Sequence, residues 1–162
     1  MIGAPERREP ARRLTPYCTG DCVTHFADSS FFVALLNKRD HHHKKAQEIF
    51  SDVLNGKYGK LVTSDYILDE GMTVTRQKTK DYEAAMKAGR MIKDSAYTKM
   101  TYIIKVYVED AYKSYKEHTD KTLSFTDWTS YHVIKFKGLS GIISFDEDFD
   151  EVDIPRIPGK TG

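Results

Sequence analysis

The sequence has little cysteine and no long apolar run. Its two cysteines, Cys18 and Cys22, have only His25 nearby, which does not complete the four ligands of a structural zinc site. No apolar stretch approaches the ~18 residues of a membrane-spanning helix. The first 13 residues also lack the apolar segment of a signal peptide. We therefore expect a cytoplasmic protein that has no membrane partner and no zinc or disulfide framework.

The chain also lacks a strong charge of either sign. It has 25 Lys and Arg against 24 Asp and Glu, a net charge of +1, so no overall field attracts nucleic acid or an anionic membrane. Any binding of a polyanion must come from local clusters. Hydrophobic residues at 40% and charged residues at 30% exclude a disordered chain and a fibrous rod. A chain of 162 residues has room for one sizeable core.

Residues 1–20 differ in composition from the rest. They contain three prolines, scattered apolar residues and four arginines, which are Arg7, Arg8, Arg12 and Arg13. We interpret this segment as a basic N-terminal tail and residues 21–162 as a single domain.

Apolar segments within residues 21–162 alternate between strand and helix patterns. Strands are predicted at 23–27, 60–63, 101–106 and 141–145, with a short last one at 152–154. Helices are predicted at 31–36, 41–54, after 64, after 81, at 109–118 and from 125 to Gly138. This alternation predicts the α/β class, with a parallel sheet covered by helices on both faces.

Acidic residues follow the predicted strands. Asp28 closes the first strand and Asp146 the fourth, while Glu70 lies about two turns into the helix after Thr63 and Asp127 near the start of its helix. Because ligands bind at the carboxyl ends of parallel strands, we expect these four acids to converge at one edge of the sheet. Each acid alone has an ordinary alternative, as a helix cap or an exposed charge. Capping does not explain why each acid follows a strand.

Four converging carboxylates would repel one another unless a cation lay among them. Hard oxygen ligands suit Mg²⁺ or Mn²⁺, ions that orient a phosphodiester and activate water. The chain has no Gly-rich phosphate loop, nucleophile elbow or HExxH sequence to favour other chemistry. The run His41-His42-His43 is similar to a metal-binding tract, but its place at a helix start favours a solvated helix terminus.

Five short motifs occur in one order. They are Asp28-Ser29-Ser30 with the apolar run after it, Asp40-x-x-His43-x-x-Ala46, Thr63 to Glu70, Leu123 to Asp127, and Ile143 to Phe149. In this order the chain resembles the PIN domain family and, within it, the VapC-like toxins of prokaryotic toxin–antitoxin pairs. The resemblance covers Val23 to Pro158.

The resemblance implies a three-layer α/β/α sandwich with a mostly parallel sheet, and a divalent-metal-dependent endoribonuclease. Asp28, Glu70, Asp127 and Asp146 take the places of the family's acidic residues. Asp148 is implied as a fifth metal ligand. Ser30, Thr126 and Ser144 are implied as hydrogen-bonding support for the acids. Mg²⁺ or Mn²⁺ is the implied cofactor and single-stranded or structured RNA the substrate, with a homodimer and an antitoxin protein as further expectations.

Some alternatives stay open at this point. The same scaffold could bind RNA or protein without cleaving it, or could act in ribosomal RNA processing or quality control. The tail is unusual for the family, and is either a misassigned start or an arm that contacts RNA through its four arginines. The tyrosines of residues 81–118 suit base stacking or a dimer interface, of which we prefer the second.

Overall fold

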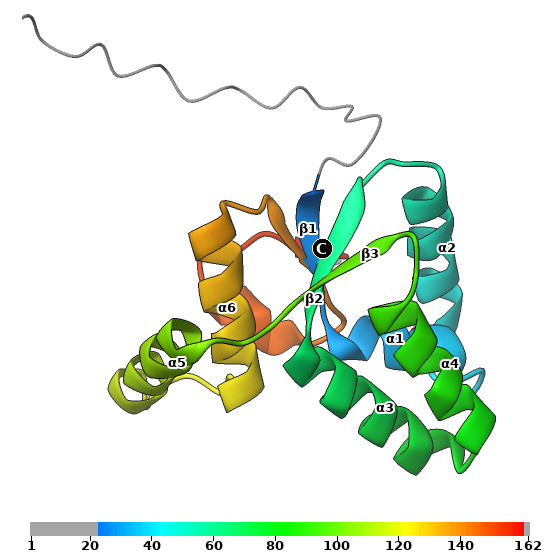
Figure 1. Ribbon diagram of the computed structural model, residues 1–162, viewed down its shortest axis with the longest axis horizontal. Coiled ribbons are helices and arrows are strands. Elements are labelled where there is room, and N and C mark those ends of the chain that lie inside the picture. The colour runs from blue at the N-terminus through cyan, green and yellow to red at the C-terminus, as the bar shows by residue number, and fades with distance from the viewer. Residues whose placement is uncertain (1–22, 161–162) are drawn as a thin grey trace, which may run out of the picture.

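Five parallel strands form the central sheet of the computed structural model, which describes residues 23–160 (Figure 1). The strands are β1 Val23–Ala27, β2 Lys60–Ser64, β3 Thr98–Thr101, β4 Gly141–Ile143 and β5 Arg156–Ile157. Their order across the sheet is β3-β2-β1-β4-β5, and every pairing is parallel. Strand β1 is therefore central, and its carboxyl end meets those of β2 and β4.

Within the described residues, six α-helices cover the two faces of the sheet (Figure 1). They are α1 Ser29–Leu36, α2 His43–Leu54, α3 Asp65–Thr79, α4 Tyr82–Lys93, α5 Lys105–Glu117 and α6 Phe125–Lys137. Helices α1 to α4 pack together on one side, and α5 packs with α6 on the other. The predicted α/β class and three-layer sandwich with a parallel sheet are confirmed.

The core lies on both faces of the central strands. Phe26, Val62, Ile142 and Ile143 are at most 2% exposed, as expected for parallel strands that are covered by helices on each side. Helix α6 has a capping box at Ser124 and ends at Gly138, whose φ of 62° suits glycine in the left-handed region. Local sequence signals therefore fix the bounds of the helix that carries Asp127.

Two predicted strands are wrong in position. The third was expected at 101–106, but β3 ends at Thr101 and α5 begins at Lys105. Between them the Ile103 N–H donates to Asp65 Oδ1 at 2.8 Å, so this apolar segment leaves the sheet. The last strand was expected at 152–154, but the pairing with β4 is made by residues 156–157.

The start of α2 also differs from the prediction. Asp40 was expected to cap a helix beginning at His41, but its Oδ1 accepts the His42 N–H at 2.9 Å within a turn. The helix itself begins at His43. The predicted tail of residues 1–20, with its four arginines and Cys18, lies outside the described residues, as does Cys22. Within residues 23–160 no helix is both long and apolar enough to cross a membrane.

Candidate active site

Asp28 lies at the carboxyl edge of the sheet, directly after β1. It is 2% exposed, and its Oδ2 accepts the Ser30 N–H at 3.2 Å, the Ser30 hydroxyl at 2.6 Å and the Ser144 hydroxyl at 2.9 Å. Within the part of the chain that the structure describes, all hydrogen bonds to this carboxylate end on Oδ2. The other oxygen, Oδ1, is therefore available to a ligand.

The two serines connect Asp28 to the loop after β4. Each hydroxyl donates its only proton to Asp28 and accepts a backbone N–H in return. Ser30 Oγ accepts from Phe145 at 3.0 Å, and Ser144 Oγ accepts from Asp146 at 3.0 Å. Because the network joins segments more than 100 residues apart in sequence, it holds the first and last acids of the site in a fixed relation.

Glu70 projects from the second turn of α3 toward the same edge. Its Oε2 accepts the Ser29 hydroxyl at 2.7 Å, which links α3 to the start of α1. Burial raises the pKa of Glu70 above its usual value, the Ser29 hydrogen bond opposes this, and the charges of Asp28 and Asp146 add to the rise.

Asp127 is the third residue of α6 and is 6% exposed. Its Oδ2 accepts the Ser124 N–H at 2.7 Å, and its own N–H donates to Ser124 Oγ at 3.2 Å, which completes the capping box. Burial and then the charge of Asp28 raise the pKa of Asp127 to about 7, although both Ser124 hydrogen bonds act in the opposite direction. A cap exposed to solvent would not show this rise.

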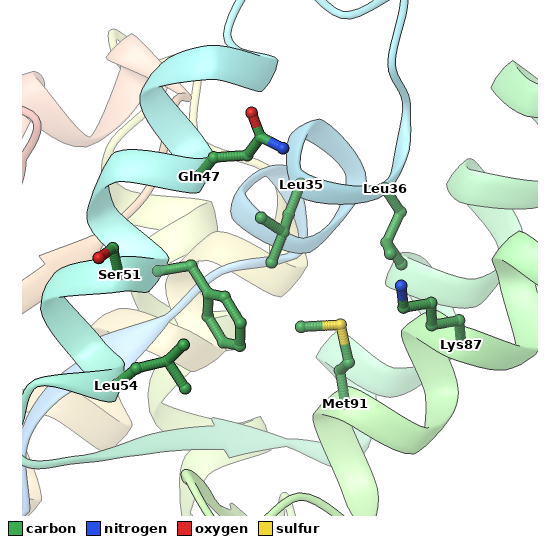
Figure 2. A pocket seen from close by; sticks show the side chains of 8 residues that line it. Leu35, Leu36, Gln47, Ser51, Leu54, Lys87 and Met91 are labelled. Atoms are coloured by element: carbon green, nitrogen blue, oxygen red, sulfur yellow. The ribbon is translucent and has the colours of Figure 1, made fainter.

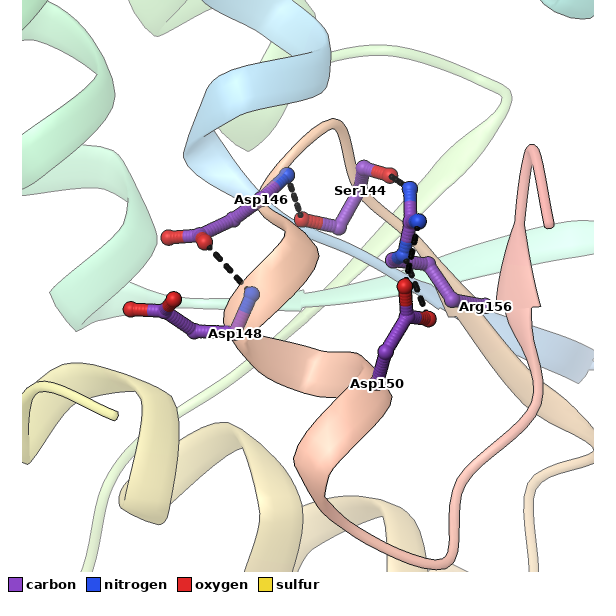
Figure 3. Close-up of polar contacts among 5 residues, drawn as sticks. All are labelled: Ser144, Asp146, Asp148, Asp150 and Arg156. Carbon is purple, nitrogen blue, oxygen red and sulfur yellow. Dashed lines mark hydrogen bonds and ion pairs between the residues drawn. The ribbon is translucent and has the colours of Figure 1, made fainter. Parts of the chain in front are cut away.

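Asp146 follows β4 and caps the short 3-10 helix η1 (Glu147–Glu151), with its Oδ1 accepting the Asp148 N–H at 2.9 Å (Figure 3). Burial raises the pKa of Asp146, and the charges of Asp148 and Asp28 raise it further. The Asp146 and Asp148 side chains lie beside each other at the start of η1.

The fold brings four of the predicted acids together. Asp28 is among the charges that raise the pKa of Glu70, Asp127 and Asp146 alike, so it lies at the electrostatic centre of the group. We call Asp28, Glu70, Asp127 and Asp146 the acidic cluster. Their burial and mutual repulsion favour the binding of a cation.

The acidic cluster offers only oxygen ligands, which fits Mg²⁺ or Mn²⁺ better than zinc. No group of three or more His, Cys, Asp or Glu side chains within residues 23–160 is already arranged to hold a metal ion. The free Oδ1 of Asp28 is the direct ligand that the geometry offers.

Arg156 fixes the loop that carries Asp146 and Asp148 (Figure 3). Its side chain is 5% exposed and makes a bidentate ion pair with Asp150, Nε to Oδ1 at 2.9 Å and NH2 to Oδ2 at 2.8 Å. Its NH1 donates to the Ser144 carbonyl oxygen at 3.3 Å. Strand β5 is thereby tied to the residue after β4 and to η1, on either side of Asp146 and Asp148.

Two adjoining hollows open beside the acidic cluster. One, of about 350 Å³, includes Glu70, Asp146 and the histidines His41 and His42 in its lining. The other, of about 380 Å³, is lined by parts of α3 and by Thr126. Glu70 and Val74 line both hollows, so the two adjoin as one cleft beside the acidic cluster, with Glu70 and Asp146 in its lining. Volumes of this order are typical of ligand sites.

A separate apolar hollow lies between α1, α2 and α4 (Figure 2). Leu35, Leu36, Phe50 and Met91 face it together with Leu54, which is 48% exposed. None of its lining residues is a carboxylate. We therefore place the chemistry in the acidic cleft and not here.

The predicted supporting residues have different outcomes. Ser30 and Ser144 both hydrogen bond to Asp28, whereas the Thr126 side chain makes no hydrogen bond to the described residues, and its support of the acids stays a prediction. The RNA-binding role of Arg7, Arg8, Arg12 and Arg13 falls on residues outside the described range.

Sequence reasoning missed Ser29 and Ser124. Ser124 carries a signal, since Ser-x-x-Asp before an apolar run indicates a capping box, but nothing local marks Ser29.

Comparisons with known proteins agree with this architecture. The family model described as PIN domain matches residues 26–155. The curated protein "23S rRNA-specific endonuclease VapC20", from two Mycobacterium tuberculosis strains, is 29% identical over 124 residues, which are 76% of this chain and 90% of the relative.

A solved structure extends the likeness to three dimensions. The crystal structure of Mycobacterium tuberculosis VapC20, described as a Sarcin-Ricin loop cleaving toxin, superposes with a TM-score of 0.74 at 25% identity. The match covers 83% of this chain and 97% of the solved one. The likeness therefore extends over almost the whole length of that toxin.

Proposed function

Because the chain belongs to the PIN domain family, we propose that it is a divalent-metal-dependent endoribonuclease that hydrolyses RNA phosphodiester bonds. The observation that carries the proposal is the acidic cluster, in which three carboxylates have raised pKa values and share Asp28 as a neighbour. Buried carboxylates held in this way are costly to the fold, and such strained clusters gather at functional sites. The similarity to a named endonuclease supports the same reaction class.

We propose Mg²⁺ or Mn²⁺ as the metal, held by Asp28, Glu70, Asp127 and Asp146, with Asp148 next to them. When bound, the ion supplies charge neutralisation and activation of water. Ser30 and Ser144 orient Asp28, as hydrogen-bonded partners of metal ligands do. With a pKa of about 7, Asp127 is partly protonated at neutral pH and must release that proton before it ligates a cation.

We propose ribosomal RNA as the substrate, because the curated relative VapC20 is named as a 23S rRNA-specific endonuclease. A toxin role is favoured over RNA maturation, since the solved relative is described as a toxin. The proposal places the protein in the cytoplasm, where ribosomes are found, and gives it an antitoxin protein as its partner.

We further propose that the protein is a homodimer. Apolar side chains that are 45% or more exposed lie on or beside α5 and α6. They are Tyr102, Ile104, Val106, Tyr112, Tyr115 and Phe136. Such a surface is typical of protein–protein contacts, which supports an interface between two copies.

The direct test is cleavage of 23S ribosomal RNA, and of a hairpin with the sarcin–ricin loop sequence, by the purified protein with Mn²⁺. We expect site-specific cleavage that EDTA prevents. The variant Asp28→Asn removes the central carboxylate and should abolish cleavage, while its amide oxygen can still accept the serine hydrogen bonds.

The matched control is Asp52→Asn, which changes a carboxylate near the end of α2 that pairs with Lys57 and lies outside the acidic cluster and both hollows beside it. It should cleave as wild type does. Absence of cleavage by the wild type with either ion would favour a scaffold that binds RNA or protein without cutting it.

A further inference from the structure

We propose that Phe145, His42 and His41 form a stacking platform for an unpaired nucleobase of the RNA, next to the acidic cluster. The inference rests on the proposed function, because it names a contact to the substrate of that same site. It assigns a binding role to two histidines that the acidic chemistry does not use.

The three rings form a continuous stack from the core to the solvent. The Phe145 ring is buried, and the His42 ring lies over it with centroids 4.5 Å apart and planes 14° from parallel. The His41 ring follows, with its centroid 3.7 Å from that of His42 and a tilt of 44°. The His41 side chain is 83% exposed, so the stack ends in a ring with solvent beside it.

The stack belongs to the cleft beside the acidic cluster. His41, His42 and Phe145 line the same hollow as Glu70 and Asp146. Phe145 directly precedes Asp146, and its own N–H is held by Ser30, so the base of the stack is fixed relative to the acidic cluster. A phosphate held at the acids would therefore bring a neighbouring nucleobase close to the rings.

The backbone under the rings is held in place before any ligand arrives. Asp40 Oδ1 accepts the His42 N–H at 2.9 Å, and the Asp40 carbonyl oxygen accepts the His43 N–H at 3.0 Å. The His43 ring contacts the Ala34 carbonyl oxygen through Nδ1 at 2.8 Å and ties this turn to α1. A rigid platform loses little entropy on binding, which favours affinity.

The chemistry of the rings fits a base more closely than a phosphate. Burial, and then the neighbouring His41, lower the pKa of His42 below its usual value, so this ring is mostly neutral at pH 7. Lys78 lines the same hollow and supplies a cation for the RNA backbone. Aromatic rings beside a cationic side chain are the usual means of binding single-stranded nucleic acid, and recognition of RNA favours unpaired bases in loops.

A solvated helix start, the interpretation favoured by sequence alone, explains only part of this arrangement. It accounts for the exposure of His41. It does not account for the near-parallel contact of His42 with Phe145, nor for the position of all three rings in the cleft of the acids.

The test uses the full-length protein and single-stranded RNA oligonucleotides that carry 2-aminopurine at one position at a time. The fluorescence of this base falls when it stacks on a ring. Binding is measured at low salt with EDTA, so that the RNA is not cleaved during the measurement. We expect quenching at one position by the wild type, and by His41→Ala a loss of that quenching with about fivefold or greater weakening of binding.

Two further variants separate stacking from charge. His41→Tyr keeps a ring and should restore quenching and affinity, whereas His41→Lys keeps a cation and should not. Tyr82→Ala removes an exposed aromatic ring from α4 and serves as the control, with binding unchanged. The platform is overturned if His41→Ala binds and quenches as wild type does, if His41→Lys restores binding as well as His41→Tyr, or if the wild type quenches at no position.

The outcome is separable from that of the proposed function. Wild-type protein that quenches the fluorescence but cleaves no RNA with Mn²⁺ or Mg²⁺ would overturn the ribonuclease and leave the platform in place. Cleavage that is unaffected by His41→Ala, together with unchanged quenching, would overturn the platform and leave the ribonuclease in place.

Discussion

Asp127 is subject to opposing influences on its pKa. The capping box with Ser124 lowers the pKa, as a helix N-terminus does for an acid, while burial and the charge of Asp28 raise it. The net result is a pKa of about 7, so repulsion and burial outweigh the cap. A residue that serves only to start a helix would not be placed where its charge is so unfavourable.

The first prediction concerns this charge in the absence of metal. Asp127→Asn should melt higher than wild type in EDTA at about pH 8, because the amide keeps the cap acceptor and removes the buried charge. Asp127 has a pKa near 4 in the unfolded chain and about 7 in the folded one, so the folded state binds more protons between these two pH values. Wild-type stability therefore falls across this window as the pH rises, by on the order of 4 kcal/mol for a pKa change from 3.8 to about 7.

Thermal melts of both proteins in EDTA from about pH 4 to pH 8 measure the effect. The advantage of the variant should be absent at the acidic end and largest at pH 8, and added Mn²⁺ should stabilise the wild type more than the variant. Asp81→Asn, at the cap of α4, is the control for loss of a cap charge and should not melt higher than wild type in EDTA at pH 8. A variant that melts lower than wild type at pH 8 and gains equally from metal would leave Asp127 as a cap alone.

At the residue scale, the sequence was sufficient to predict the acids of the cluster but not the residues that hydrogen bond to them. The rule that ligand groups follow parallel strands selects Asp28 and Asp146, and the fold places both at one edge. The bonds between Ser144 and Asp28, or between Ser29 and Glu70, join segments whose approach depends on the whole sheet. No local pattern encodes such pairings, so they appear only in the structure.

At the scale of elements, the sequence predicted helices better than the short edge strands. Asp81 and Gly138 were predicted to bound helices, and α4 begins and α6 ends next to them. The segments around Ile103 and Ile154 are apolar enough to resemble strands, but each packs its side chains without joining the sheet. Strand β5 holds only two residues, and its place is set by Arg156 and its long-range contacts.

The second prediction follows from that contact of β5. Arg156→Met keeps most of the volume of the side chain but leaves Asp150 without its partner in a largely buried position. Loss of one member of a fully buried ion pair typically costs about 3–5 kcal/mol and loss of an exposed pair about 0–1 kcal/mol. We expect a loss between these values because the pair is only partly buried. The displaced loop should also weaken stabilisation by Mn²⁺, since it carries Asp146 and Asp148.

Urea unfolding and melts with Mn²⁺ measure both effects. The double variant Arg156→Met, Asp150→Asn should recover part of the stability, because the unpaired charge is then gone. Lys57→Met breaks the exposed pair with Asp52 and should leave stability close to that of the wild type. Equal small losses for the Arg156 and Lys57 variants would show that the buried pair does not fix the loop.

At the scale of the whole molecule, the distribution of charge matters more than its sum. Four of the 25 basic residues and two of the 24 acidic residues lie in residues 1–20. The remaining chain then has 21 basic and 22 acidic residues, a net charge of −1, and its cleft is lined by acids. A domain of this charge gains no long-range attraction to RNA. The four arginines of the tail are a local basic cluster, which the net charge of the whole chain does not reveal.

The last prediction is that these arginines supply the salt-dependent part of RNA binding. Replacing Arg7, Arg8, Arg12 and Arg13 by Gln in the full chain should weaken RNA binding strongly at low salt and little at high salt. If each arginine neutralises one phosphate, the slope of log K against log salt should become smaller by about 3, at roughly 0.7 per phosphate of a single strand. Cleavage of a short saturating substrate should stay near the wild-type rate, because the acidic cluster is untouched. Binding isotherms at several salt concentrations decide the matter, with Lys44→Gln and Lys45→Gln on exposed α2 positions as a charge control. An unchanged slope would mean that the polyanion is attracted by the domain itself, and the role of the tail in RNA binding would be lost.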